Sequence, residues 1–362
     1  MKCSGCFLKN TLTVLRKLSL LFCRGEMLFL VLIVVLSFVV SDIRWLIKRT
    51  DLRIAFEGAG VNWKATLEKM WYNFNITMFG KNKKKKNKKL KIGLALSGGS
   101  ALGIAHIGAI KAFKQNNIKI DCISGTSAGA VVAACYAFDV PLEQMVEISK
   151  KLNWASISDF GYSKLGLNSN SPVGRIIKKY IGDKKIEDAK IPLAIIATDI
   201  DTGKKVVFRK GSLAEAVMAS SCIPVFFTPV KIGSKKLVDG MLVENLPFSP
   251  LKEMGAELEI GVDLGTWMAK KKTQNVLDVI NNGYGIMIRE QSAVARGNGR
   301  IIIEPHLEKF TIFDFKKPEN LIRSGFNATL LVIPKIKLKS RRRKYDKLRN
   351  FFKKFFKALG FR

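Results

Sequence analysis

Between residues 91 and 138, apolar positions alternate between short continuous runs and longer runs with helical spacing. The runs Lys91–Ser97 and Ile118–Ser124 predict buried strands, and Ala101–Asn116 and Ala128–Phe138 predict helices. Strands that alternate with helices in this way run parallel, are joined by right-handed crossovers and are covered by helices. The pattern therefore predicts an α/β fold built on a mostly parallel sheet.

Further strand signals continue the pattern toward residue 304, and the chain shows no internal repeat. The expected strands cover residues 191–199, 205–208, 236–238, 258–263 and 301–304. The segment Asp201-Thr202-Gly203 marks a hairpin turn between the first two of them.

The stretch Met27–Val40 is apolar except for Ser37 and is bounded by charged residues. It is shorter than the ~20 residues that a spanning helix needs. Three interpretations remain: a membrane anchor, a signal peptide cleaved near Ser41, and an interfacial or re-entrant helix. A basic segment follows, and Lys and Arg near a membrane tend to stay on the cytoplasmic side. We therefore expect residues 1–50 to be a retained membrane-associated segment, with the rest of the chain in the cytoplasm.

The net charge of +33 is concentrated in two segments. Residues 81–91 carry eight lysines and no acid, and residues 335–362 carry thirteen Lys or Arg and one acid. Such blocks are usually solvated, but they also attract polyanions, either nucleic acid or an anionic bilayer. The apolar N-terminal run favours the bilayer, and no stretch matches a nucleic-acid-binding module. The expected organisation is a hydrophobic segment (1–50), a connection with a polybasic linker (51–90), a catalytic domain (91–334) and a basic tail (335–362).

The basic tail ends in an amphipathic pattern. Its lysines lie away from an apolar helical face that holds Phe351, Phe352, Phe355, Phe356 and Leu359. This pattern is typical of a helix in a membrane interface, and also of a helix that docks on its own domain. The RRRK segment just before it favours the membrane, because anionic lipid attracts it.

The six cysteines predict neither a disulfide framework nor a metal site. Cys3 and Cys6 form a C-x-x-C without a second pair, which argues against structural zinc. Cys122 and Cys135 fall in the apolar strand and helix runs, as buried thiols do.

A glycine-rich loop, Ser97-Gly98-Gly99-Ser100, separates the first predicted strand from the first predicted helix. Backbone N–H groups at such a turn stabilise negative charge. A dinucleotide-binding loop needs a glycine where Ser100 stands, and a phosphate-binding loop needs a Gly-Lys-Ser/Thr that is absent. The remaining interpretation is an oxyanion hole formed by Gly98, Gly99 and Ser100.

A second motif, Gly125-Thr126-Ser127-Ala128-Gly129, lies between the second strand and the second helix. This is the G-x-S-x-G pattern of a nucleophile elbow, in which a tight strand-to-helix turn exposes a serine hydroxyl. The alternative is a serine or threonine that only caps the helix. The strand–turn–helix setting, about 25 residues after the glycine loop, favours Ser127 as a nucleophile.

The base for this serine has three candidates. A Ser-His-Asp triad needs a histidine, and the chain holds only His106 and His306. The third candidate is Asp239, which ends a predicted strand and is followed by Gly240, so that its carboxylate projects from the strand end. From the residues alone, a triad with His306 and a Ser127–Asp239 pair both remain open.

Four blocks of the chain resemble the patatin-like phospholipases, in particular the bacterial branch related to the neuropathy-target-esterase catalytic domain. These blocks are LALSGGSALGIAHIGAI, ISGTSAGAVVAACYA, IIATDIDTGKKVVF and AVMASSCIPVFFTPVKI with the following LVDGMLVENLPFSPLKEMGAE. The resemblance extends from about residue 91 to 331. It implies a three-layer α/β/α fold with a Ser127–Asp239 dyad, Asp239 acting as the proton acceptor. It also implies an oxyanion loop of Gly98, Gly99 and Ser100, without a metal or another cofactor.

Three residues depart from the family pattern. Ser100 replaces the third glycine of the loop, Leu102 replaces a basic residue, and Met241 follows Asp239-Gly240 where the family has glycine or alanine. The leading hypothesis is an acyl-ester hydrolase at a membrane that acts on phospholipids or lysophospholipids. Two alternatives are acyl transfer on the same dyad and a non-catalytic lipid-binding scaffold.

Overall fold

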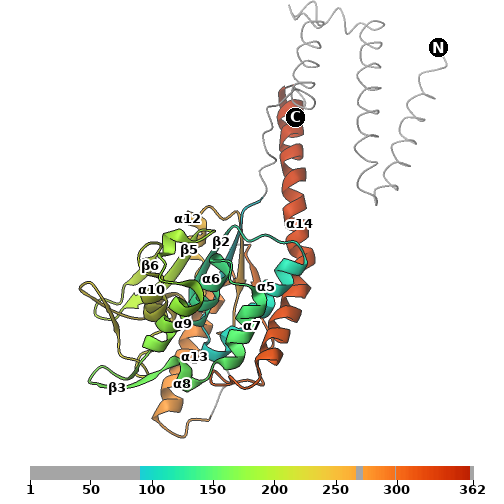
Figure 1. Cartoon of the computed structure of the whole chain (residues 1–362). Helices are drawn as coiled ribbons and strands as arrows, with labels where there is room; N and C mark the ends of the chain where they lie inside the picture. Colours follow the sequence, from blue (N-terminus) through green and yellow to red (C-terminus); the bar gives the residue numbers. More distant parts are fainter. Residues whose placement is uncertain (1–89, 266–271, 298, 359–362) are drawn as a thin grey trace, which may run out of the picture. The chain divides into compact units, whose positions relative to one another are not determined.

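Figure 1 shows the computed structural model of the chain, in which residues 90–265, 272–297 and 299–358 are described. For residues 340–358 the description covers the backbone alone. The run Met27–Val40, most of the polybasic linker and the three N-terminal cysteines lie outside the described residues. Within them, no helix combines the length and the apolar character that a membrane crossing requires.

In the described part of the chain, eight strands form one sheet in the order β10-β9-β1-β2-β5-β8-β7, and β6 also pairs with β5. The first five strands of this order run parallel to one another, and β6, β8 and β7 pair antiparallel. The prediction of a mostly parallel sheet is thus confirmed. The strand bounds are Ile92–Leu96 (β1), Cys122–Thr126 (β2), Leu193–Asp199 (β5), Lys205–Phe208 (β6), Val230–Ile232 (β7), Lys235–Asp239 (β8), Leu258–Val262 (β9) and Ile301–Ile303 (β10).

Helices connect these strands, and a separate hairpin leaves the main sheet. The hairpin joins β3 (Asp159–Ser163) to β4 (Gly166–Ser169). The first expected helix is divided into a short 3₁₀ helix and α5. The helices are η1 (Ser100–Ile104), α5 (Ala105–Gln115), α6 (Ala128–Ala137), α7 (Leu142–Lys151), α8 (Trp154–Ile157), α9 (Ser171–Ile181), η2 (Ile186–Asp188), α10 (Leu213–Ser220), α11 (Met241–Glu244), α12 (Ser249–Glu253), α13 (Val276–Ala295) and α14 (Pro318–Ala358).

The sheet has a buried core on each of its two faces, which makes the fold a three-layer α/β/α structure. Successive strand residues point to opposite faces, and the two cores divide accordingly. Leu94, Leu96 and Ile123 belong to the large core, which includes residues of α5, α6 and α14. Ala95 and Cys122 belong to a smaller core on the other face, together with residues of α12 and α13. Both faces of the strands are therefore apolar, as the continuous apolar runs require.

Helix α14 packs along α5 at very close range. An added Cβ on Gly108 of α5 would lie 1.9 Å from the carbonyl oxygen of Ile322 in α14, so only glycine permits this approach. The helix continues without a break past Pro334 and through the basic tail to Ala358. The backbone of the tail is therefore helical as far as residue 358.

Changing Gly129 to alanine is expected to destabilise the fold by roughly 3 kcal/mol or more. A Cβ at Gly129 would lie 2.2 Å from the carbonyl oxygen of Leu96 in β1, so α6 would have to move away from the sheet. A Cβ added at Gly283 in α13 would meet no atom within 4 Å. Gly283→Ala should therefore stabilise the folded state by roughly 0.5–1 kcal/mol. Urea denaturation of both variants measures the difference. Equal loss of stability in the two would contradict the close approach at Gly129.

Candidate active site

Ser127 forms the sharp turn between β2 and α6. Its backbone has φ 53° and ψ −125°, a conformation that residues other than glycine rarely adopt. The Ser127 N–H donates a 2.8 Å hydrogen bond to the Ser220 hydroxyl, which helps hold this conformation. The Ser127 side chain is only 5% exposed. Strained residues of this kind persist where the surrounding structure holds them, and they cluster at functional sites.

Asp239 is the last residue of β8 and is completely buried. Its Oδ1 accepts a 2.9 Å hydrogen bond from the Met241 N–H, and its Oδ2 accepts no well-formed hydrogen bond from any described residue. Burial raises the pKa of this carboxyl group to about 7, and interactions with the Ser127 hydroxyl and the Met241 N–H partly offset the rise. The fold therefore brings Ser127 and Asp239 together, and it leaves one carboxylate oxygen without a competing partner.

The tight turns around both residues depend on glycine. A Cβ at Gly125 would lie 2.4 Å from the carbonyl oxygen of Gly129. A Cβ at Gly240 would lie 2.4 Å from the carbonyl oxygen of Ile196 in β5. Both glycines thus let a backbone segment approach the end of the sheet closely enough to place the neighbouring side chain.

The glycine loop lies directly against Ser127. A Cβ at Gly98 would lie 3.1 Å from the Cβ of Ser127. The Gly98 N–H donates to Asn245, at 3.2 Å from the side-chain oxygen and 3.3 Å from the backbone oxygen. The Gly99 and Ser100 N–H groups donate to no other described residue. Among the described residues, two of the three expected oxyanion donors therefore have no acceptor, and the third is bonded to Asn245.

The three residues that depart from the family pattern, Ser100, Leu102 and Met241, fit into the glycine loop and the region beside Asp239. Ser100 adopts a positive φ of 50°, a conformation that favours glycine at this position. Leu102 is buried where the family carries a basic residue, and Met241 is buried beside the aspartate. Leu102 and Met241 line the same cavity as Ser127.

The two histidines lie away from the Ser127 hydroxyl. His106 is buried in α5, and its Nε2 lies 2.8 Å from the carbonyl oxygen of Ser97. Burial lowers the pKa of His106 to about 4. His306 lies in an exposed loop, 3.4 Å from Glu308. Neither histidine lines a cavity that contains Ser127.

Two cavities meet at Ser127, and they share only Ser100, Ser127, Trp154 and Ile223. The first, the apolar cavity, has an empty volume of about 950 Å³ and extends along α6. Most of its walls are aliphatic, with contributions from Val131, Val132, Cys135, Met145, Ile148, Leu152, Val173 and Ile176.

The second, the mixed cavity, has an empty volume of about 1360 Å³. Its lining includes polar residues from the first turns of α13 and several aromatic residues. The polar residues are Asn275, Asp278, Asn281 and Asn282, and the aromatic residues include Trp154, Phe226, Phe310 and Phe313. Ser127 thus lies between an apolar space and a space with polar groups.

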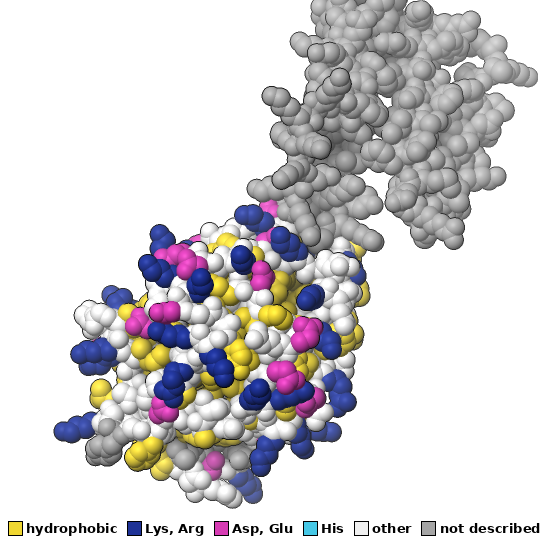
Figure 2. Space-filling view, in the orientation of Figure 1, with side chains coloured by type: hydrophobic (Ala, Val, Ile, Leu, Met, Phe, Trp, Pro, Cys, Tyr) yellow, Lys and Arg dark blue, Asp and Glu magenta, His cyan; other side chains and the backbone are white. Residues whose placement is uncertain are grey.

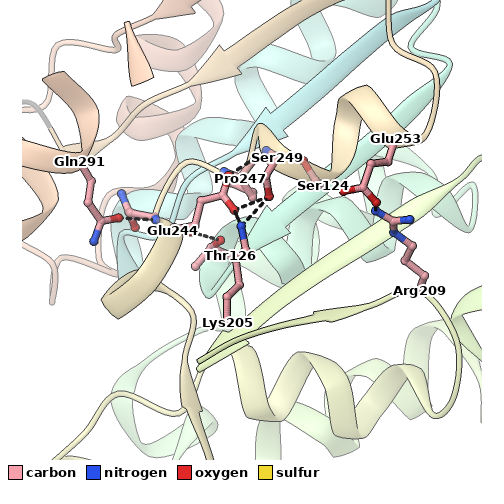
Figure 3. A network of polar contacts seen from close by, with 10 residues as sticks. Ser124, Thr126, Lys205, Arg209, Glu244, Pro247, Ser249, Glu253 and Gln291 are labelled. Carbon is pink, nitrogen blue, oxygen red and sulfur yellow. Dashed lines mark hydrogen bonds and ion pairs between the residues drawn. The ribbon is translucent and has the colours of Figure 1, made fainter. Parts of the chain in front are cut away.

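A polar network ties the segment after Asp239 to the strand before Ser127 (Figure 3). The Thr126 hydroxyl donates to the carbonyl oxygen of Glu244 at 2.9 Å, and the Ser124 hydroxyl donates to that of Pro247 at 2.5 Å. The Glu244 carboxylate in turn forms an ion pair with Lys205 at 2.9 Å. Because β2 and this segment are joined at several points, the positions of Ser127 and Asp239 are coupled.

Sequence reasoning missed Asn245, Ser220 and the α13 residues of the mixed cavity. Asn245 is the one amide in the segment MLVENLPF, six residues after Asp239, and this is a weak signal. Ser220 is one of two consecutive serines at the end of α10, so nothing in the sequence distinguishes it from Ser221. Within the described residues, no cluster of His, Cys, Asp and Glu has the arrangement of a metal site.

Comparisons with known proteins give a consistent assignment. The family model "patatin-like phospholipase" matches residues 94–252. Lysophospholipase NTE1 of Scheffersomyces stipitis is 26% identical over 268 residues, which cover 65% of this chain and 17% of that protein. An NTE family protein of Mycobacterium bovis is 31% identical over 207 residues, or 56% of this chain and 57% of that protein. The chain thus spans only part of these relatives.

Among solved structures, VipD from Legionella pneumophila aligns with a TM-score of 0.41 and 13% identity, covering 68% of this chain and 67% of that one. The family match covers the glycine loop, the serine turn and the strand that ends in Asp239. Residues 94–252 of this chain therefore form a domain of the patatin-like phospholipase family.

Proposed function

We propose that this chain is a serine acyl-ester hydrolase in which Ser127 is the nucleophile and Asp239 its base. The observation that carries the proposal is the pairing of a strained, buried serine with a buried carboxylate that has one unpartnered oxygen. A carboxylate with an ordinary pKa is a weak base at neutral pH, and a pKa of about 7 suits proton transfer far better.

The reaction begins when the Ser127 Oγ attacks the acyl carbonyl carbon and Asp239 Oδ2 accepts the hydroxyl proton. The tetrahedral intermediate collapses, the ester C–O bond breaks, and the leaving alcohol takes the proton from Asp239. Water then enters, gives a proton to Asp239 and attacks the acyl-enzyme. The fatty acid leaves when the Ser127 Oγ–carbonyl bond breaks and Ser127 regains its proton.

We assign stabilisation of the tetrahedral oxyanion to the N–H groups of Gly99 and Ser100, which donate to no acceptor in the described part of the chain. Gly98, the third donor expected from the sequence, touches Ser127 and is bonded to Asn245. We therefore assign Gly98 the role of holding the loop against the serine. Its N–H can donate to the oxyanion only if its hydrogen bond to Asn245 breaks.

The two cavities suggest where the parts of the substrate bind. The walls of the apolar cavity are mostly aliphatic, so it suits a fatty-acyl chain. The mixed cavity suits the glycerol and headgroup side of the ester, which carries hydrogen-bonding groups. We infer a phospholipid or lysophospholipid substrate, supported by the patatin-like phospholipase domain and by the lysophospholipase name of the NTE1 relatives.

We further propose that the protein acts at a membrane, with its catalytic domain on the cytoplasmic side. The support comes from the sequence: the apolar run Met27–Val40, the lysine-rich linker and the basic tail all suit an anionic bilayer.

A fluorophosphonate probe tests the chemistry directly, because it forms a covalent bond only with an activated serine. Wild-type protein should be labelled, and peptide mapping should place the label on Ser127. Ser127→Ala should abolish labelling, while Ser221→Ala, which removes another hydroxyl lining the apolar cavity, should retain it. Absence of labelling in folded wild-type protein would reject the hydrolase and leave a lipid-binding scaffold. A second measurement adds a lysolipid acceptor and identifies the products. Free fatty acid indicates hydrolysis, and an acylated acceptor indicates acyl transfer.

A further inference from the structure

Large apolar side chains are exposed on the elements that line the mixed cavity and on a hairpin bonded to one of them. We call them the mouth surface: Phe160, Leu165 and Leu167 of the β3–β4 hairpin, Val276 and Val279 of α13, and Val225 and Phe313 from two loops. Phe160 is 94% exposed and Val276 72%. Single exposed apolar residues are normal, but a group of them on the elements that form one cavity indicates a binding partner. In Figure 1 the hairpin and the first turns of α13 lie at the same, lower end of the domain.

The hairpin is attached to a segment that reaches the cavity. The Leu167 N–H donates to the carbonyl oxygen of Val225 at 3.1 Å, and the Asn168 N–H donates to that of Phe226 at 3.1 Å. The Phe226 ring lines the mixed cavity and lies 6.4 Å from the ring of Phe313. Hydrogen bonds and a ring contact therefore connect the hairpin, this segment and the Phe313 loop.

Val225 is held in a strained conformation with its side chain exposed. Its φ of 72° is a genuine outlier for a β-branched residue. The Val225 side chain is 42% exposed, whereas Phe227, two residues later, is buried and stacks on Trp154 at a ring-centroid distance of 5.7 Å. The backbone twist thus directs Val225 outward from the same segment that supplies the cavity wall. Strain of this kind points to a function for the position.

The first turns of α13 present two different faces. Asn275, Asp278 and Asn282 line the mixed cavity, while Val276 and Val279 are exposed. Residues three and four apart share a helix face, so the exposed valines form a stripe beside the polar face. The Tyr284 hydroxyl donates to the carbonyl oxygen of Pro224 at 3.4 Å, which joins α13 to the Val225 segment.

Five exposed lysines lie in the segments that carry the mouth surface or line the mixed cavity, or close to them in sequence: Lys164, Lys272, Lys309, Lys316 and Lys317. The same segments hold four acids. Asp159 forms an ion pair with Arg175 at 2.8 Å, and Glu308 lies 3.4 Å from His306. Asp278 and Asp314 accept hydrogen bonds from the N–H groups of Gln274 and Thr311. Figure 2 shows hydrophobic side chains among Lys and Arg side chains along the lower edge of the domain.

We propose that the mouth surface docks on an anionic lipid bilayer. Apolar side chains enter the interface, the exposed lysines contact anionic headgroups, and the entrance to Ser127 faces the lipid. The docking itself does not depend on catalysis, whereas delivery of a lipid to Ser127 rests on the function proposed above.

Hydrogen exchange of the full chain tests the docking without requiring activity. The protein is mixed with vesicles of ether-linked phosphatidylcholine and phosphatidylglycerol, which an esterase cannot cleave. Residues 159–169 and 223–227 should become protected, and residues 203–211 on a distant edge of the sheet should not. If the chain pellets with the vesicles but 159–169 stays unprotected, the proposal is overturned. Protection that grows with protein concentration in the absence of lipid would assign the surface to a contact between copies, and would also overturn it.

A triple variant, Phe160→Ser with Leu165→Ser and Leu167→Ser, gives a second readout. It should lose hydrolysis of vesicle lipid by about tenfold or more and keep hydrolysis of a soluble short-chain ester. Val294→Ser, at an 81% exposed position near the other end of α13, is the matched control and should keep both. Unchanged vesicle activity in the triple variant would contradict the docking. Absence of both activities in wild-type protein would count against the hydrolase, and the exchange experiment would still decide the docking.

Discussion

Replacing Asp239 with asparagine is expected to lower ester hydrolysis by about 1,000-fold while the fold is retained. The amide oxygen can still accept the Met241 N–H, so the turn after β8 keeps its hydrogen bond. The amide group cannot accept the Ser127 proton, because its nitrogen is not a base. The loss should appear mainly in kcat, because the carboxylate acts on the reacting hydroxyl and not on the bound lipid.

The pH dependence of wild-type activity should report the same group. The ionised carboxylate is the active form, so kcat/KM should rise with pH and level off above the pKa of about 7. An ordinary aspartate would already be fully active near about pH 5. A profile that is flat down to that pH would contradict a buried Asp239 base. Activity of Asp239→Asn equal to wild type would reject the dyad outright.

The raised pKa also predicts a change in stability. The folded state holds the Asp239 proton more tightly than the unfolded chain, in which the pKa of this carboxyl group has its ordinary value of 3.8. The contribution of this group to the free energy of unfolding therefore falls as pH rises from about 4 to about 7, and is constant above. Asparagine carries no charge, so Asp239→Asn should unfold at a higher temperature than wild type at about pH 8. Thermal denaturation at about pH 4 and about pH 8 separates this effect from a general change in packing.

Replacing Cys135 with tryptophan is expected to reduce hydrolysis of long-chain esters by about 100-fold relative to short-chain esters. Cys135 lines the apolar cavity on α6, seven residues beyond Ala128. At 1.5 Å per residue this places it about 10 Å further along the helix. A tryptophan there fills the far part of the cavity, and leaves the space beside Ser127 open for a short acyl chain.

The measurement compares kcat/KM for butyryl and lauroyl esters of the same alcohol. Cys135→Ala, which does not fill the cavity, is the matched control and should keep the long-chain activity. Val132→Phe, also in the cavity wall, should give a smaller shift in the same direction if the tryptophan variant fails to fold. Equal loss for both esters in a folded variant would contradict the assignment of this cavity to the acyl chain.

The sequence predicted the alternation of strands and helices along residues 91–138 and the two turns that hold the glycine loop and Ser127. The continuous apolar runs before Gly98 and Gly125 predicted buried parallel strands, and β1 and β2 confirm them. The local sequence was sufficient for this prediction, because the glycine spacing and the strand–turn–helix order involve residues only a few positions apart. The β3–β4 hairpin was not predicted, since its exposed Phe160 and Leu167 do not follow the pattern of a half-buried strand.

Our proposal of Asp239 as the base in place of a histidine rests on the tertiary structure and on the family resemblance. His106 and His306 are ordinary candidates by sequence, but the fold buries one behind the glycine loop and leaves the other in an exposed loop. The pairing of β8 with β5 brings Asp239 to the strand end near Ser127, across more than 100 residues of chain. The raised pKa of Asp239 comes from burial by distant segments, which no local pattern encodes. The two cavities arise in the same way, because their walls come from helices far apart in the sequence. The sequence alone thus determined the serine turn, the glycine loop and the type of fold. Only the tertiary structure decided how the serine, its neighbouring carboxylate and the cavities around them are arranged, because burial and long-range strand pairing exist only in the folded chain.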